Sequence, residues 1–134
     1  MEECRERRRA GEGKTTRREV MGDAHVDGAM AAADSFTADF QEYITRAAWG
    51  AVWSRPGLDR RTRSCITVAM LAAQGSEHEL ALHVRAALRN GVSVDEIKEI
   101  LLQVAVYAGV PRANRAFSIA HDALGDARPA TGSP

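Results

Sequence analysis

The strongest fold signal in the chain is the run of residues 77–111, EHELALHVRAALRNGVSVDEIKEILLQVAVYAGVP. A serine followed three residues later by a glutamate is a capping box, which marks the start of a helix. Two such boxes punctuate this region, Ser76-x-x-Glu79 and Ser93-x-x-Glu96. Glycines stop each helix, and a proline suits the first turn of the next. The predicted helices run over residues 77–89, 94–108 and 111–124.

Similar punctuation continues toward the N-terminus. Asp59 is predicted to cap a helix that runs to Gln74, and its second half is almost wholly apolar, as in a core or an oligomer interface. Ser35 is predicted to cap a helix with one apolar face. Thr16-x-x-Glu19 is a further capping box. Short links between helices favour antiparallel neighbours, so the chain is predicted to be an all-α bundle.

The domain limits follow from composition. Residues 1–13 are charged and are expected to be flexible, residues 14–125 to form a single helical domain, and residues 126–134 to be a flexible tail. Cys4 lies in a polar segment and Cys65 in an apolar one, so a disulfide is not expected. These features, with no signal-like N-terminus and no long apolar run, predict a cytoplasmic protein.

The overall charge balance restricts the possible partners. The 134 residues contain 18 basic and 18 acidic side chains, and the formal net charge is zero. Neither nucleic acid nor a membrane surface is expected to bind such a chain through a global positive field. Because a net charge of zero gives little repulsion between copies, we expect a homo-oligomer.

The densest polar cluster is EHELALH, residues 77–83. His78 and His83 are five residues apart, about 140° around a helix, so the zinc-protease arrangement is not expected. Glu79 and His83 share a helix face, and a carboxylate beside an imidazole suits general acid–base chemistry. Alternatives remain open: Glu79 as the capping residue only, His83 as a core histidine, and His78 as a solvated residue of the first turn.

Arginines cluster at the start of the preceding helix. Arg60 and Arg63 are three residues apart and could both point into one pocket, where guanidinium groups bind carboxylates. The alternative is a solvated helix start. His25 is either a surface histidine of a connecting segment or a residue that reaches the pocket.

Three stretches together resemble the γ-carboxymuconolactone decarboxylase family, which has an alkylhydroperoxidase-like fold. They are RREVMGDAHVDGA (17–29), WGAVWSRPGLDRRTRSCITVAMLAA (49–73) and EHELALHVRAALRNGVSVDEIKEILLQVAVYAGVP with the ANRAF that follows. The cysteines of the peroxidase relatives are replaced by Ser76 and Glu79, while their histidine remains as His83. Thiol peroxidase chemistry therefore lacks its nucleophile here.

The resemblance implies a homo-oligomer, a trimer or hexamer, that uses neither cofactor nor metal. The implied reaction converts γ-carboxymuconolactone to β-ketoadipate enol-lactone and carbon dioxide in aromatic catabolism. His83 or His78 would donate the proton, and Glu79 would orient or relay. The remaining expected site residues, Arg60, Arg63 and His25, would bind the substrate.

Two alternatives remain. The same scaffold could serve a related lyase or isomerase that acts on another small conjugated acid, because a fold does not fix a substrate. The chain could also be a non-catalytic assembly module in which the histidines are structural.

Overall fold

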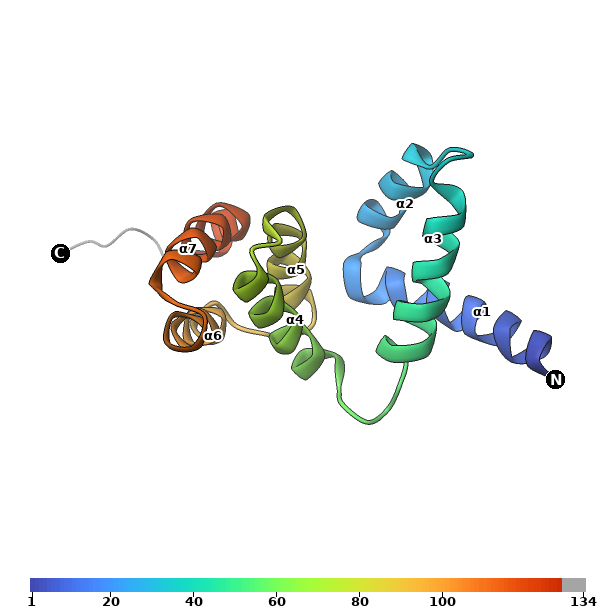
Figure 1. Ribbon diagram of the computed structural model, residues 1–134, viewed down its shortest axis with the longest axis horizontal. Helices are drawn as coiled ribbons and strands as arrows, with labels where there is room; N and C mark the ends of the chain where they lie inside the picture. Colours follow the sequence, from blue (N-terminus) through green and yellow to red (C-terminus); the bar gives the residue numbers. More distant parts are fainter. Residues whose placement is uncertain (129–134) are drawn as a thin grey trace. The chain divides into compact units, whose positions relative to one another are not determined.

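The computed structural model describes residues 1–128. The chain divides into two compact units, residues 1–60 and the part from Arg61 onward, and each is described by itself (Figure 1). Every regular element of residues 1–128 is helical and none is a strand, which confirms the all-α class. None of the helices in this range is long and apolar enough to cross a membrane.

The N-terminal unit is built on α1 (Glu2–Met21), followed by α2 (Asp23–Ala32), α3 (Ala38–Ile44) and the π-helix η1 (Thr45–Trp53). Helix α1 packs against η1. A Cβ atom added at Gly13 of α1 would lie 2.1 Å from the Thr45 carbonyl oxygen, and one at Gly50 of η1 would lie 2.1 Å from that of Arg9. Glycine therefore allows the two helices to approach backbone to backbone.

Two predictions of helix starts in this unit are wrong. Thr16 is a buried residue inside α1, which already begins at Glu2, so its capping box does not open a helix. Ser35 does not cap the next helix, because the Asp34 carboxylate accepts hydrogen bonds from the backbone N–H groups of Phe36 and Thr37, at 2.9 and 3.0 Å. Gly22 ends α1 with a φ of 91°, a backbone conformation that favours glycine.

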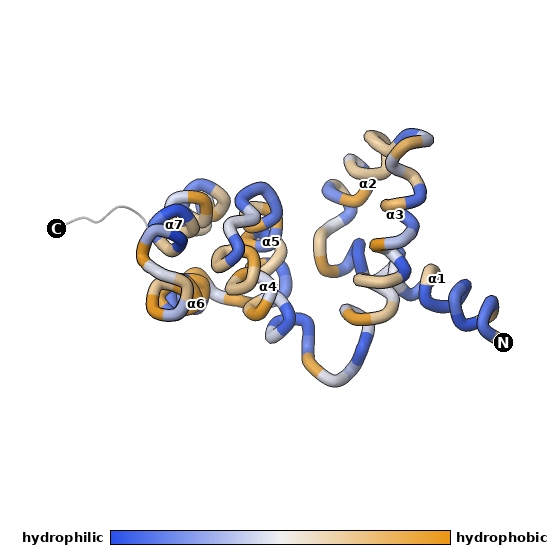
Figure 2. Tube along the Cα trace, viewed as in Figure 1, coloured by the Kyte–Doolittle hydropathy of each residue, from blue (hydrophilic) through white to orange (hydrophobic). Residues whose placement is uncertain are grey.

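The second unit contains α4 (Arg60–Gln74), α5 (Glu77–Arg89), α6 (Val94–Tyr107), α7 (Val110–Leu124) and a short 3₁₀ turn (Gly125–Ala127). Helix α7 packs against both α5 and α6. Figure 2 shows hydrophobic stretches along α6 and α7, in contrast to the hydrophilic start of α1. The core is a continuous aliphatic cluster of Val68, Ala72, Leu80, Val84, Ala87, Val92, Ile97, Leu101, Val104, Ala116 and Ala120.

The two predicted capping boxes of this unit differ in outcome. At the start of α6 the box forms: Ser93 Oγ accepts from the Glu96 N–H at 3.1 Å, and a Glu96 carboxylate oxygen accepts from the Ser93 N–H at 3.0 Å. At the start of α5 no side-chain capping bond forms within the described chain. There the Ser76 hydroxyl instead accepts a hydrogen bond from Gln74 Nε2 at 2.9 Å.

The predicted domain limits at residues 13 and 125 stay a prediction. Residues 2–13 belong to α1. The last part of the predicted tail, residues 129–134, lies outside the described residues.

Candidate active site

Helix α5 carries three of the predicted site residues. His78 and Glu79 lie exposed in its first turn, and His83 lies half-buried one turn further on. Leu80 and Val84 direct one side of α5 into the core, being 2% and 0% exposed. His83 is about 60° around the helix from Leu80, so it lies at the edge of the core, with its Nδ1 atom buried.

Glu79 is not a capping residue. The Ser76 backbone N–H, which a capping box would direct to the Glu79 carboxylate, instead donates to the Leu71 carbonyl oxygen at 3.0 Å, and no side-chain capping bond forms in the described chain. The alternative that Glu79 serves only as a cap is therefore wrong. Its exposed carboxylate lies four residues before His83, on the same side of α5, where it can orient the imidazole.

Helices α4 and α5 share the aliphatic core of the second unit, through Val68 and Ala72 of α4 and Leu80 and Val84 of α5. Asn90, directly after α5, donates from Nδ2 to Ser64 Oγ of α4 at 3.1 Å, and Ser64 is fully buried. Asn90 follows His83 by seven residues, two helical turns, so the two are about 20° apart around the axis. The Asn90–Ser64 hydrogen bond joins the end of α5 to α4 at the residue after Arg63. That His83 and Arg63 share one pocket stays a prediction.

The arginines of α4 differ in their surroundings. The Arg60 guanidinium forms an ion pair with the Glu19 carboxylate, and that of Arg61 with the Glu96 carboxylate. Arg63 is half-buried, and its Nε atom is buried. Arg60 and Arg63 are both half-buried, and both remain candidates for binding a substrate anion.

His25 lies half-buried on α2, in the N-terminal unit, whereas Arg63, His78, Glu79 and His83 lie in the second unit. Its place in a shared pocket stays a prediction. Its position on an ordered helix corrects the expectation of a connecting segment.

A further group of charged side chains lies at the start of α5 and was not predicted. Arg115 of α7 binds the Glu77 carboxylate through two hydrogen bonds, from Nε at 2.7 Å and from Nη2 at 3.1 Å. This guanidinium holds the pKa of the Glu77 carboxyl below its usual range. Arg112 lies against the same turn, since a Cβ atom added at Gly75 would come within 1.8 Å of its Nη1. The three-residue spacing of Arg112 and Arg115 is the signal from which this cluster could have been found.

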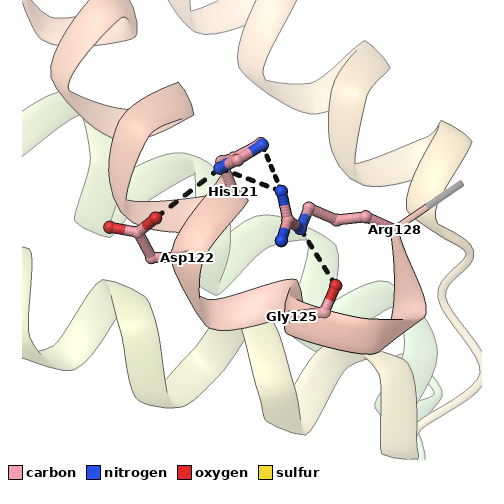
Figure 3. A network of polar contacts seen from close by, with 4 residues as sticks. All are labelled: His121, Asp122, Gly125 and Arg128. Atoms are coloured by element: carbon pink, nitrogen blue, oxygen red, sulfur yellow. Dashed lines mark hydrogen bonds and ion pairs between the residues drawn. The ribbon is translucent and has the colours of Figure 1, made fainter. Parts of the chain in front are cut away.

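His121 of α7 has a different role. The Arg128 guanidinium donates a hydrogen bond to Nε2 of the His121 ring, and the Asp122 carboxylate lies 3.5 Å from Nδ1 (Figure 3). The exposed His121 side chain thus takes part in a surface contact at the end of α7, apart from the predicted site residues.

The described residues 1–128 contain no group of three His, Cys, Asp or Glu side chains placed to hold a metal ion. Cys4 is exposed and Cys65 is half-buried, and neither forms a disulfide within this range.

Imidazole, carboxylate and guanidinium groups on two helices of one unit suit proton transfer to a small anion, the chemistry of a lyase. The chain belongs to the carboxymuconolactone decarboxylase family, whose model matches residues 38–122. It is 47% identical over 115 residues to 4-carboxymuconolactone decarboxylase of Acinetobacter baylyi, covering 86% of each chain. It is also 42% identical over 120 residues to nitrosuccinic acid decarboxylase of Metarhizium robertsii, covering 90% of this chain and 84% of the relative.

Proposed function

We propose that this protein decarboxylates γ-carboxymuconolactone to β-ketoadipate enol-lactone and carbon dioxide. The observation that carries the proposal is the 47% identity to a relative named for this activity, over 86% of both chains. The site supports it, because His83, Glu79 and Arg63 lie on adjoining helices of one unit.

The reaction needs an electron acceptor and a proton donor. The bond between the γ-carbon and the leaving carboxylate breaks, and its electron pair is delocalised through the conjugated lactone onto the carbonyl oxygen. A proton then adds to the carbon next to that carbonyl, giving the enol-lactone. The substrate itself takes up the electron pair, so the proposed reaction requires no cofactor.

The proposed roles follow from position. His83 donates the proton, because it is half-buried and has the exposed Glu79 carboxylate on its side of the helix. Arg63 binds a substrate carboxylate, and Arg60 and His25 are proposed to assist. His78, exposed in the first turn of α5, is the second candidate donor.

A second substrate is favoured by one observation, the 42% identity to a nitrosuccinic acid decarboxylase. Nitrosuccinate and γ-carboxymuconolactone share a chemical logic: both are dicarboxylates in which a built-in group, nitro or conjugated lactone, accepts the electron pair. The alternative function is thus decarboxylation of a small dicarboxylate with a different electron acceptor.

We further propose an alkylhydroperoxidase-like fold, a cytoplasmic location and a homo-oligomer, a trimer or hexamer. Large apolar side chains exposed on the second unit support self-association. Among them, Met70 is 60%, Val106 75% and Tyr107 82% exposed.

Direct turnover tests the proposal. Purified protein, treated with a chelator, is incubated separately with γ-carboxymuconolactone and nitrosuccinate while carbon dioxide release and ultraviolet absorbance are followed. We expect preferential consumption of the lactone. Preference for nitrosuccinate would support the second substrate, and no carbon dioxide from either would contradict both and favour a non-catalytic module.

A further inference from the structure

The N-terminal unit contains a cavity of about 460 Å³ between α1, α2 and α3. This volume is within the roughly 300–1,000 Å³ of pockets that bind small organic ligands. Its wall is largely apolar and includes Val26 and Met30 of α2. Lys14 and Arg17 of α1 and Gln41 of α3 add polar groups.

Arg17 is the unusual member of this wall. The residue is only 6% exposed, and burial lowers the pKa of its guanidinium. Nη1 donates to Gln41 Oε1 at 3.1 Å, while the buried Nε has no hydrogen-bond partner among the described residues. No carboxylate within residues 1–128 forms an ion pair with Arg17. Burying a cation without a counter-charge is costly, so such a group is well suited to receive an anion.

The neighbouring residue Arg18 differs from Arg17, because carboxylates neutralise its charge. Arg18 also lines the cavity, but its guanidinium pairs with Asp23 at 3.2 Å and with Asp27 at 2.9 Å. These carboxylates raise the pKa of Arg18. The acidic residue of the cavity wall, Glu42, pairs instead with Arg46 at 3.7 Å. The positive charge of Arg17 is thus left for a ligand.

We propose that this cavity binds a small organic carboxylate with an apolar body, whose carboxylate is held by Arg17. Lys14, one turn earlier on α1, adds positive charge, and Val26 and Met30 contact the hydrocarbon part. The proposal goes beyond the proposed function, because none of these residues belongs to the candidate active site.

The test uses the full chain and an aromatic probe, naphthoate, with the uncharged naphthamide as its matched control. Binding is measured by calorimetry and by the ligand-induced shift of the melting temperature. We expect naphthoate to bind at least about tenfold more tightly than naphthamide, because charge-assisted hydrogen bonds are strong. Arg17→Met should weaken naphthoate binding by at least about tenfold. Arg18→Met, which removes an arginine already paired with carboxylates, should leave it nearly unchanged.

Two controls keep the result interpretable. Without ligand, Arg17→Met should melt at or above the wild-type temperature, because it replaces an uncompensated buried charge with an unbranched apolar side chain. Should it fail to fold, Arg17→Lys keeps the charge but loses the planar fork, and weaker naphthoate binding by that variant supports the proposal equally.

Equal naphthoate binding by wild type and Arg17→Met would overturn the proposal. So would a loss of binding in His83→Gln as large as in Arg17→Met, since the probe would then occupy the proposed active site. Absence of lactone turnover, with binding still dependent on Arg17, would contradict the proposed function alone.

Discussion

In the unit from Arg61 onward, a continuous cluster of aliphatic side chains joins the helices, whereas in residues 1–60 the closest approach is backbone to backbone, at Gly13 and Gly50. The N-terminal unit also buries Thr16 and Arg17, while Ser64 is the buried polar residue of the other unit within residues 61–128. One unit thus depends on apolar volume, and the other on close helix contact and on polar groups that need partners. The two units of the chain therefore differ in the interactions that stabilise them.

The largest expected effect that separates the two units is a loss of turnover on replacing the proposed proton donor. His83→Gln should lower kcat on γ-carboxymuconolactone by about a hundredfold or more, because it removes the proposed proton donor. His25→Gln, in the other unit, should raise KM with a smaller effect on kcat if it only binds substrate. His121→Gln serves as the matched control. Unchanged turnover in His83→Gln would remove this residue from the proposed role.

A core truncation tests the aliphatic unit. Leu101 is 1% exposed and its neighbour Leu102 is 47% exposed. Leu101→Ala should lower the free energy of unfolding by about 2–5 kcal/mol, as expected when a cavity forms in a packed core. Leu102→Ala should cost much less. Urea unfolding followed by circular dichroism gives both values, and equal losses would contradict the proposed core.

A pair of glycine substitutions in α1 tests the backbone contact. Gly13→Ala should destabilise the protein by about 1–3 kcal/mol, because the new methyl group would meet the Thr45 carbonyl oxygen. Gly11→Ala should be neutral or stabilising by up to about 1 kcal/mol, since nothing in the described chain lies within 4 Å of the new Cβ atom. Thermal unfolding measures the difference, and a neutral Gly13→Ala would show that the helices separate easily.

Replacing the serines that precede α5 and α6 should change the free energy of unfolding by a smaller amount. Ser93→Ala should cost about 1 kcal/mol, because it removes a formed capping box. Ser76→Ala should cost less, since its hydroxyl makes no capping bond in the described chain. Urea titration of both variants compares them, and equal costs would indicate a cap at α5 in solution.

The smallest expected effect is a change in stability at low pH. The Arg115 guanidinium lowers the pKa of Glu77, so this contact stabilises the folded state above the ordinary glutamate pKa and is lost as the pH falls through the lowered value. Glu77→Gln should therefore reduce stability slightly at neutral pH, with a difference from wild type that disappears in strong acid. Melting temperatures across the acid range check this, and a difference that persists at the lowest pH would contradict it.

Sequence reasoning succeeded where the signal was local. The Ser93 box and the glycine stops depend on neighbouring residues alone, so they could be predicted, as could the amphipathic face that carries Glu79 and His83. It failed at the start of α5, where the Ser76 backbone N–H bonds to the carbonyl oxygen of Leu71 in the preceding helix rather than to Glu79. The burial of Arg17 and the Glu77–Arg115 pair depend on tertiary packing, which no short-range pattern in the sequence encodes.

The π-helix η1 makes the helix contact of the N-terminal unit sensitive to the length of the chain. A π-turn contains one residue more than an α-turn, so it behaves as an insertion that the helix absorbs. Deleting one residue between Thr45 and Trp49 would let the segment close as an ordinary α-helix, rotating the downstream residues of η1 by about 100°. Gly50 would then turn away from Arg9, and a bulkier side chain would face α1 instead.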